Sequence, residues 1–260
     1  MKWRIGAAVA LSLVLVQMLT ATDPRFGGTF IGAIICTDGI LIGADSRSTF
    51  IDGSGKHIGY VDGISKIFAQ TGTAFAVSGL SSMGSELFPA FLRRNDYLLS
   101  KPSTEVLYDV FLHLPFNNAT NVVLISAGYV DGESMICAKD PTTPQNCQKN
   151  GMLTNKPSPS LRRWQATVKG EPSLREAAVA LKQAILESAS GDSTVGGPVA
   201  LLHLRKNAAP AWIENGSQDG GWTQICDIVS DYRRNKTAIG FTNSREELDR
   251  FLLAVCPGRK

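Results

Sequence analysis

The sequence predicts an α+β protein in which two stacked antiparallel sheets are flanked by helices. Strand-like segments occur as neighbouring pairs joined by short turns, of which the Asp-Gly pairs at 38–39 and 131–132 are typical. Strands precede and follow a central block of helices, without the strand–helix alternation of Rossmann or TIM folds. The segments at 29–36 and 40–45 are apolar on both faces, so each requires cover on both sides.

Composition places the chain among ordinary globular proteins. Its 260 residues are 43% apolar and only 19% charged, which excludes an intrinsically disordered chain. The length supports one sizeable core. The formal net charge of +3 is too small to indicate a protein that binds nucleic acid or a membrane surface through charge.

The N-terminus has the pattern of a secretory signal peptide. Lys2 and Arg4 are followed by a nearly uncharged apolar run at 5–19 and by the small-residue site at 19–21. A membrane anchor is the alternative, but a spanning helix needs about 20 apolar residues and this run is shorter. We therefore expect residues 1–21 to be removed and the protein to be secreted or periplasmic.

The first third of the mature chain reads as hairpins. After the strands at 29–36 and 40–45, residues 50–64 are rich in Gly and predict a long loop. The segments 65–68 and 74–77 then predict a second hairpin, because apolar strand formers flank a turn.

Helices follow in the middle of the chain. Apolar residues recur at helical spacing within 81–98, and Ser103 is a candidate cap for a second helix that runs to about residue 114. Strands return at 121–129 and 134–138.

The last third is mixed. Residues 139–172 hold five of the twelve prolines and predict irregular structure. Ser173 and Glu176 form a capping box that opens a helix, and Gly191 is its expected end. The remaining predicted elements are strands at 198–204 and 211–214 and a helix at 244–255.

The five cysteines fit an oxidising compartment. Cys36 lies in an apolar strand and is expected to be a buried free thiol. Cys137 and Cys147 flank a short loop, and Cys226 with Cys256 is the natural second pair, although spacing alone leaves other pairings open. No Cys-x-x-Cys occurs and the three histidines are far apart, so we expect neither a metal site nor a cofactor.

One set of residues carries chemistry. Gly28-Thr29 precedes the first strand, the second strand ends in Ala-Asp-Ser-Arg at 44–47, Lys66-Ile67 follows the loop, and Ser78-Gly79 ends the next hairpin. In this order and spacing the sequence resembles the proteasome β-subunit family of N-terminal nucleophile hydrolases. The segment 192–203 resembles a second block of that family.

The resemblance implies a four-layer αββα sandwich and self-cleavage between Gly28 and Thr29. Residues 22–28 would then be a short propeptide and residues 29–260 the hydrolase domain. A threonine hydroxyl is a weak nucleophile that needs an adjacent base, and the released α-amine, with an ordinary pKa of about 7.7–8.0, suits that task.

The resemblance also assigns roles to other residues. Lys66 would lower the pKa of the amine, Asp45 would hold Lys66 in place, and the N–H of Gly79 would form the oxyanion hole. Asp192 belongs to the second block. Ser48 and Val77 would line the substrate pocket, where small or apolar side chains are expected.

The sequence departs from the family pattern at three places. The loop between Asp45 and Lys66 is longer than is usual. Val195 stands where the family has a serine, and residues 139–172 offer no clear match to the loop that supplies another serine. Proton transfer around the amine is therefore expected to differ.

The sequence thus predicts an exported threonine-type peptidase or amidohydrolase. A catalytically inactive binding or structural relative and a secreted amidase for small molecules are the alternatives. The expected partner is a peptide or a small amide substrate. A homo-oligomer is an open option, whereas nucleic acid, an ATP-driven unfoldase and, after signal removal, a membrane are not expected partners.

Overall fold

The computed structural model describes residues 29–51, 57–79, 94–113 and 122–216, together with the short segments 82–83 and 86–87. The predicted signal peptide and propeptide lie outside these ranges. So do the predicted C-terminal helix, Cys226 and Cys256.

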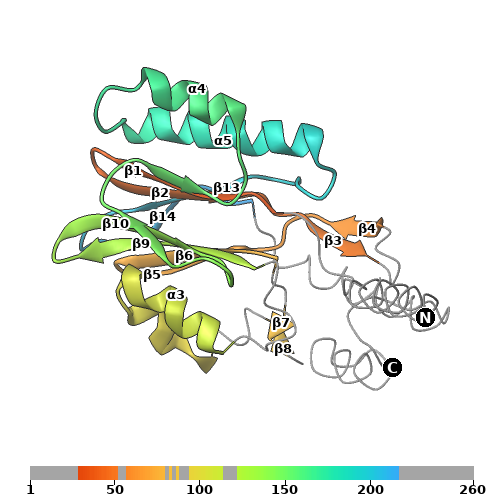
Figure 1. Ribbon diagram of the computed structural model, residues 1–260, viewed down its shortest axis with the longest axis horizontal. Helices are drawn as coiled ribbons and strands as arrows, with labels where there is room; N and C mark the ends of the chain where they lie inside the picture. The colour runs from red at the N-terminus through yellow and green to blue at the C-terminus, as the bar shows by residue number, and fades with distance from the viewer. Residues whose placement is uncertain are drawn as a thin grey trace, which may run out of the picture.

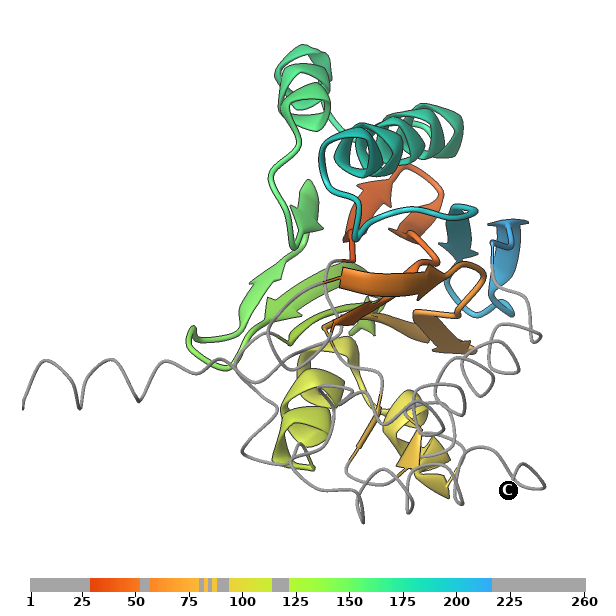
Figure 2. The same cartoon turned by 90° about the vertical axis from the view of Figure 1, so that its right-hand side faces the viewer.

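The described chain forms four layers (Figure 1). Helices α4 (Pro159–Thr167) and α5 (Leu174–Gly191) cover one sheet. A second sheet is stacked beneath it, with α3 (Ser103–Leu112) and the 3-10 helix η1 (Asp96–Ser100) on its outer face. Figure 2 shows the same order of layers after a quarter turn. The predicted α+β sandwich of two antiparallel sheets flanked by helices is confirmed.

The upper sheet carries the start of the described chain near its centre. Strand β1 pairs with β2 in register from Ile31–Ala44 to Cys36–Gly39, as the Asp-Gly turn predicts. All residues of both strands are buried. In spatial order the strands are β12 (Met152–Thr154), β1 (Ile31–Cys36), β2 (Gly39–Ala44), β13 (Ala200–Leu204) and β14 (Ala211–Glu214).

The lower sheet is also antiparallel throughout its described strands. Its order is β11 (Asn146–Gln148), β10 (Glu133–Lys139), β9 (Val123–Val130), β6 (Thr73–Ser78) and β5 (Ile67–Gln70). Two smaller pairs stand apart from the sheets: β3 (Ser48–Ile51) with β4 (His57–Val61), and β7 (Ser82–Met83) with β8 (Glu86–Leu87).

Three apolar layers fill the space between these elements. Side chains such as Ile42 and Ile125 pack between the two sheets. Phe75 and Leu107 join the lower sheet to α3, and Leu181 joins α5 to the upper sheet. The strands of the sandwich interior are therefore buried on both faces, which explains why their sequences are apolar without alternation.

Two glycines set how closely α5 approaches the upper sheet. Gly32 and Gly43 face each other across β1 and β2, and Leu181 of α5 lies over them. A Cβ atom would come within 2.9 Å of Leu181 at Gly32 and within 2.7 Å of it at Gly43. The close contact fixes the position of α5, and with it the position of the segment that follows Gly191.

Several sequence-based expectations are wrong in detail. Within 81–98, the described pairs 82–83 and 86–87 are bridged strands and residues 96–100 form a 3-10 helix, so no single helix spans the segment. Ser103 is the first residue of α3 rather than its cap, which is Pro102. The segment 50–64 contains paired backbone of β3 and β4.

Residues 139–172 are more regular than predicted. They contain β11, β12 and α4, which are too short to show a clear hydrophobic periodicity in the sequence. The sequence did contain a helix-start signal for α4. Ser158 caps the helix by accepting a hydrogen bond from Leu161 N, and Pro159 occupies the first turn. By contrast, the capping box of Ser173 and Glu176 at α5 is confirmed.

The predicted loop closure by cysteines is also confirmed. Cys137 on β10 and Cys147 on β11 are directly opposite each other and form a disulfide. Cys36 is a buried free thiol, and burial raises its pKa to about 12, which keeps it protonated and unreactive.

Candidate active site

Three residues predicted to act together meet at one buried point. Lys66, just before β5, donates from Nζ to Thr29 Oγ1 over 2.8 Å and to Asp45 Oδ1 over 3.0 Å. It also donates to the backbone carbonyl of Arg47. Thr29 precedes β1 and Asp45 follows β2, so the two residues lie at the same end of this hairpin of the upper sheet. Lys66, which precedes β5 of the lower sheet, contacts both of them there.

Asp45 is the most constrained of the three. Its side chain is fully buried, and besides Lys66 it accepts from three backbone amides. Phe30 N lies 2.9 Å from Oδ1, and Arg47 N and Gly196 N lie 3.2 Å and 3.0 Å from Oδ2. A carboxylate with four donors is stable as an anion even in the protein interior.

Burial sets the electrostatics of Lys66. Burial lowers the pKa of its ammonium, and the charge of Asp45 opposes that shift. Lys156 lowers the pKa further through charge repulsion. A lysine of this kind holds its charge less firmly than one in solvent, and that charge sits against the Thr29 hydroxyl.

Gly79 follows the end of β6 and has a φ of +77°. The preceding hydroxyl, Ser78 Oγ, lies 3.5 Å from the carbonyl oxygen of Thr29. The turn that contains Gly79 therefore lies beside Thr29, in a left-handed conformation that glycine adopts without strain.

The two predicted pocket residues lie in different surroundings. Ser48 is half-buried and is the first residue of β3, directly after Arg47. Val77 is buried and packs with Leu98 and Leu107 between the lower sheet and its helices. The structure does not bring the Val77 side chain into the group around Thr29.

Asp192 belongs to a separate group. It caps the C-terminus of α5, with Oδ2 lying 2.5 Å from Lys156 Nζ and Oδ1 accepting from Thr194. Partial burial raises its pKa, but the hydrogen bonds from Lys156 and Thr194 outweigh that effect and hold the pKa at about 2. Val195, the residue at the serine position, is buried in the apolar layer under α5.

Sequence reasoning missed Asn155 near Thr29, and it gave no role to Arg47 of the motif at 44–47. Asn155, directly after β12, donates to the Thr29 carbonyl over 2.7 Å and accepts from Ile31 N over 2.8 Å. Arg47 is fixed by a bidentate pair with Asp62, at 2.8 Å and 3.0 Å, and stacks on Tyr60. Asn155 is 126 residues from Thr29, so only the pairing of β12 with β1 reveals its contact.

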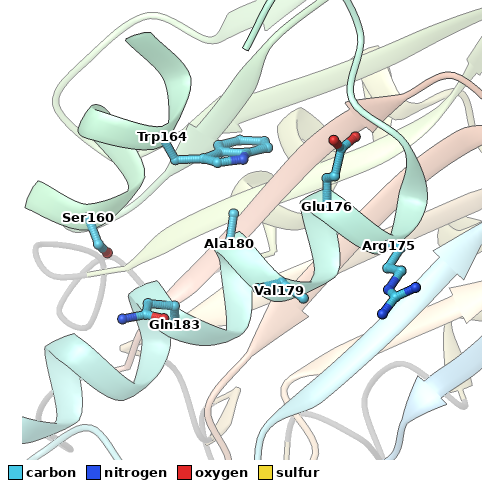
Figure 3. A pocket seen from close by; sticks show the side chains of 7 residues that line it. All are labelled: Ser160, Trp164, Arg175, Glu176, Val179, Ala180 and Gln183. Atoms are coloured by element: carbon cyan, nitrogen blue, oxygen red, sulfur yellow. The ribbon is translucent and has the colours of Figure 1, made fainter. Parts of the chain in front are cut away.

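A cavity of about 380 Å³ lies elsewhere, between α4 and α5 (Figure 3). Trp164 stands over Ala180 in its middle, with Ser160 and Gln183 at one end and Arg175 and Glu176 at the other. Its lining includes none of Thr29, Asp45 and Lys66. The cavity lies on the helical side of the upper sheet, so it does not enlarge the site around Thr29.

Two further findings concern the described residues alone. Nowhere in these ranges do three or more His, Cys, Asp or Glu side chains gather as a possible metal site. Among the helices described, none combines the length and the apolar character that crossing a membrane requires.

Comparison with known proteins identifies the fold. No protein-family model and no curated protein sequence matches the chain. Among solved structures, a Gly-1 mutant of Anbu from Hyphomicrobium sp. strain MC1 is similar, with a TM-score of 0.55 and 16% identity over 80% of this chain and 97% of that one. Anbu from the same strain in another crystal form gives 0.51 and 15%, over 80% of this chain and 96% of that one. The likeness establishes that this chain has the same α+β sandwich fold as these structures.

Proposed function

We propose that this protein is an exported threonine-type hydrolase that cleaves peptide or amide bonds with Thr29, released by self-cleavage after Gly28. One observation carries the proposal. Lys66 Nζ is in hydrogen-bond contact with both Thr29 Oγ1 and the buried carboxylate of Asp45. This contact places a buried ammonium directly against the Thr29 hydroxyl, and a buried charged group with a specific partner is a candidate for a chemical role.

The released α-amine of Thr29 is the general base of the proposed reaction. It takes the proton of Oγ1 while the oxygen attacks the substrate carbonyl carbon, and the resulting oxyanion accepts a hydrogen bond from Gly79 N–H. The ammonium then returns the proton to the leaving amine as the C–N bond breaks. Water hydrolyses the ester on Thr29 with the amine again acting as base.

Lys66 contributes electrostatically rather than as the base. Its charge lies 2.8 Å from Oγ1, where it stabilises the developing alkoxide and lowers the pKa of the neighbouring amine. Asp45 keeps that charge in position, because three backbone amides hold its carboxylate in place against Lys66. The amine is therefore neutral, and able to accept a proton, near neutral pH.

Self-cleavage uses the same nucleophile. Thr29 Oγ1 attacks the carbonyl carbon of Gly28, the peptide bond to Thr29 N breaks as an ester forms, and water hydrolyses that ester. The products are a carboxylate on Gly28 and the free amine on Thr29. Glycine at position 28 leaves the backbone free to adopt the tight turn that this attack requires.

Export is supported by the disulfide as well as by the N-terminal pattern. The Cys137–Cys147 bond closes the hairpin of β10 and β11, and structural disulfides persist mainly in oxidising compartments. A protein in such a compartment does not meet cytosolic ATP-driven unfoldases. The proposed substrates are therefore peptides, unfolded segments or small amides that reach the site without ATP.

A catalytically inactive relative is the second candidate, and Val195 is the observation that favours it. Its apolar side chain is buried under α5, so position 195 supplies no hydroxyl to the Thr29 group, and Asp192 is engaged with Lys156. The two candidates differ in whether the chain is shortened to Thr29.

The test compares wild type with Thr29→Ala and Thr29→Ser. We expect Thr29→Ala to abolish both the shortening of the chain and the hydrolysis of short apolar peptide substrates. Thr29→Ser retains a hydroxyl and should retain both activities at a reduced rate. Hydrolysis by Thr29→Ala at the wild-type rate would rule out Thr29 as the nucleophile.

A further inference from the structure

Asn155 makes contacts to both sheets at the point where they approach Thr29. From its place after β12 in the upper sheet, its Nδ2 donates to the Thr29 carbonyl over 2.7 Å and reaches Ser78 Oγ over 3.0 Å at the end of β6 in the lower sheet. Its Oδ1 accepts from Ile31 N over 2.8 Å. One side-chain amide therefore uses both of its polar atoms at the site.

These contacts hold the backbone of residues 29–31 in place, although the first residues of a chain are otherwise free to move. Terminal residues fray unless they are tied down, and after self-cleavage Thr29 would be the first residue of the chain. Asp45 fixes Phe30 N from one side, while Asn155 fixes the Thr29 carbonyl and Ile31 N from the other. The backbone amide of Asn155 also donates to the carbonyl of Ile31, which anchors Asn155 itself.

The link to the lower sheet has a second consequence. The proposed nucleophile belongs to the upper sheet, but the proposed oxyanion donor, Gly79 N–H, follows β6 of the lower sheet. Direct contact between the two is weak, because Ser78 Oγ lies 3.5 Å from the Thr29 carbonyl. The shorter bonds of Asn155 to each of them form the firmer bridge.

We propose that Asn155 is a positioning residue that holds Thr29 at a fixed distance from the oxyanion donor at Gly79. This inference rests on the proposed function, because it needs Thr29 to be the nucleophile. Asn155 acts through Thr29 and Ser78 and takes no part in proton transfer. Its loss therefore lowers the rate of the chemical step and leaves substrate binding largely intact, since misplacement by about 1 Å can cost about 100-fold.

The test variant is Asn155→Asp, which keeps the size of the side chain and the acceptor for Ile31 N. It replaces the amide donor by an oxygen that faces the Thr29 carbonyl, so the bridge is lost. We expect kcat to fall by about 10- to 100-fold with KM within about twofold of wild type. Asn150→Asp, an identical change at an exposed position before β12, is the matched control and should match wild type.

A second variant protects the test against a general loss of folding. Ser78→Ala removes the lower-sheet end of the bridge, together with the long contact from Ser78 Oγ to the Thr29 carbonyl, and leaves the bond from Asn155 to Thr29. Its kcat should fall less than that of Asn155→Asp, again with KM unchanged. Amide hydrogen exchange of the peptide 29–36 should accelerate in Asn155→Asp and remain at the wild-type rate in Asn150→Asp.

The outcomes separate the two claims. If Thr29→Ala is inactive but Asn155→Asp keeps the wild-type kcat, the role of Asn155 is wrong and the proposed function stands. A rise in KM without a fall in kcat would also overturn the role, since it would place Asn155 in substrate binding. If Thr29→Ala and wild type are equally active or equally inactive, the proposed function fails and the role of Asn155 fails with it, whatever the exchange data show.

Discussion

Two groups of polar residues lie near the start of β1, and they differ in burial and in chemistry. Thr29, Asp45 and Lys66 form a buried network whose members bond to one another. Lys156 and Asp192 form a partly exposed ion pair, with side chains that are 26% and 37% exposed. Loss of Asp45 or Lys66 from the first group leaves the other as a buried charge without its partner, whereas water can replace either partner in the second.

The same substitution at three lysines should reveal this difference most strongly. Lys66→Met leaves the Asp45 carboxylate buried without its countercharge, so we expect a loss of about 3–5 kcal/mol in the free energy of unfolding. Lys156→Met and Lys182→Met break partly exposed pairs and should each cost less than about 1 kcal/mol. Urea denaturation measures all three. A Lys66→Met protein as stable as Lys182→Met would contradict the buried network.

Val195→Ser restores the serine of the family pattern and tests whether a hydroxyl at position 195 would contribute to hydrolysis. Because Val195 is buried in the apolar layer under α5, the new hydroxyl should cost about 2 kcal/mol of stability and give no gain in hydrolysis. Val199→Ser changes another buried valine of the same layer and serves as the control. Faster hydrolysis in Val195→Ser alone would show that position 195 faces the site.

The charge of Lys156 should affect the pH dependence of activity more than stability. Lys156 lowers the pKa of Lys66, and a cation at that position lowers the pKa of the Thr29 amine in the same direction. Lys156→Met should therefore raise the amine pKa and move the acid limb of the kcat/KM profile to higher pH. Lys182→Met should leave the limb in place. An acid limb that stays fixed in Lys156→Met would mean that the two groups are not coupled.

The smallest effect is expected for Asp192 in acid. Its folded-state pKa of about 2 lies below the ordinary value of 3.8, so the carboxylate stabilises the fold at neutral pH, and that contribution is lost as the pH falls through about 4 to 2. Asp192→Asn should be less stable than wild type at neutral pH by under about 1 kcal/mol, because the pair is partly exposed. The difference should vanish near pH 2; a constant difference would assign it to causes other than this ionisation.

The residues around Thr29 also differ in how well they could be predicted from the sequence. Thr29, Asp45 and Lys66 could be proposed as a group because their order and spacing resemble the opening of the proteasome β-subunit family, and the structure brings their side chains together. Asn155 could not, since its contact depends on a three-residue strand, β12, that no periodicity reveals. The pocket role expected for Val77 depends on which way its side chain points, and that side chain packs in the apolar layer between the lower sheet and α3.

The four-layer architecture was also predictable. Long apolar strands and the capped helix α5 carry strong local signals. The segment 139–172 was misread because its strands are short and its prolines are compatible with a helix start, as Pro159 demonstrates at α4. Short elements take their structure from neighbours in space, and a single sequence does not display those neighbours.

The most direct test of the central claim is the N-terminal sequence of the mature protein, combined with its intact mass. If Thr29 is a nucleophile that releases itself, the mature chain begins at Thr29 and its mass matches residues 29–260, while Thr29→Ala begins near Thr22. A wild-type chain that begins near Thr22 and never shortens would contradict the account.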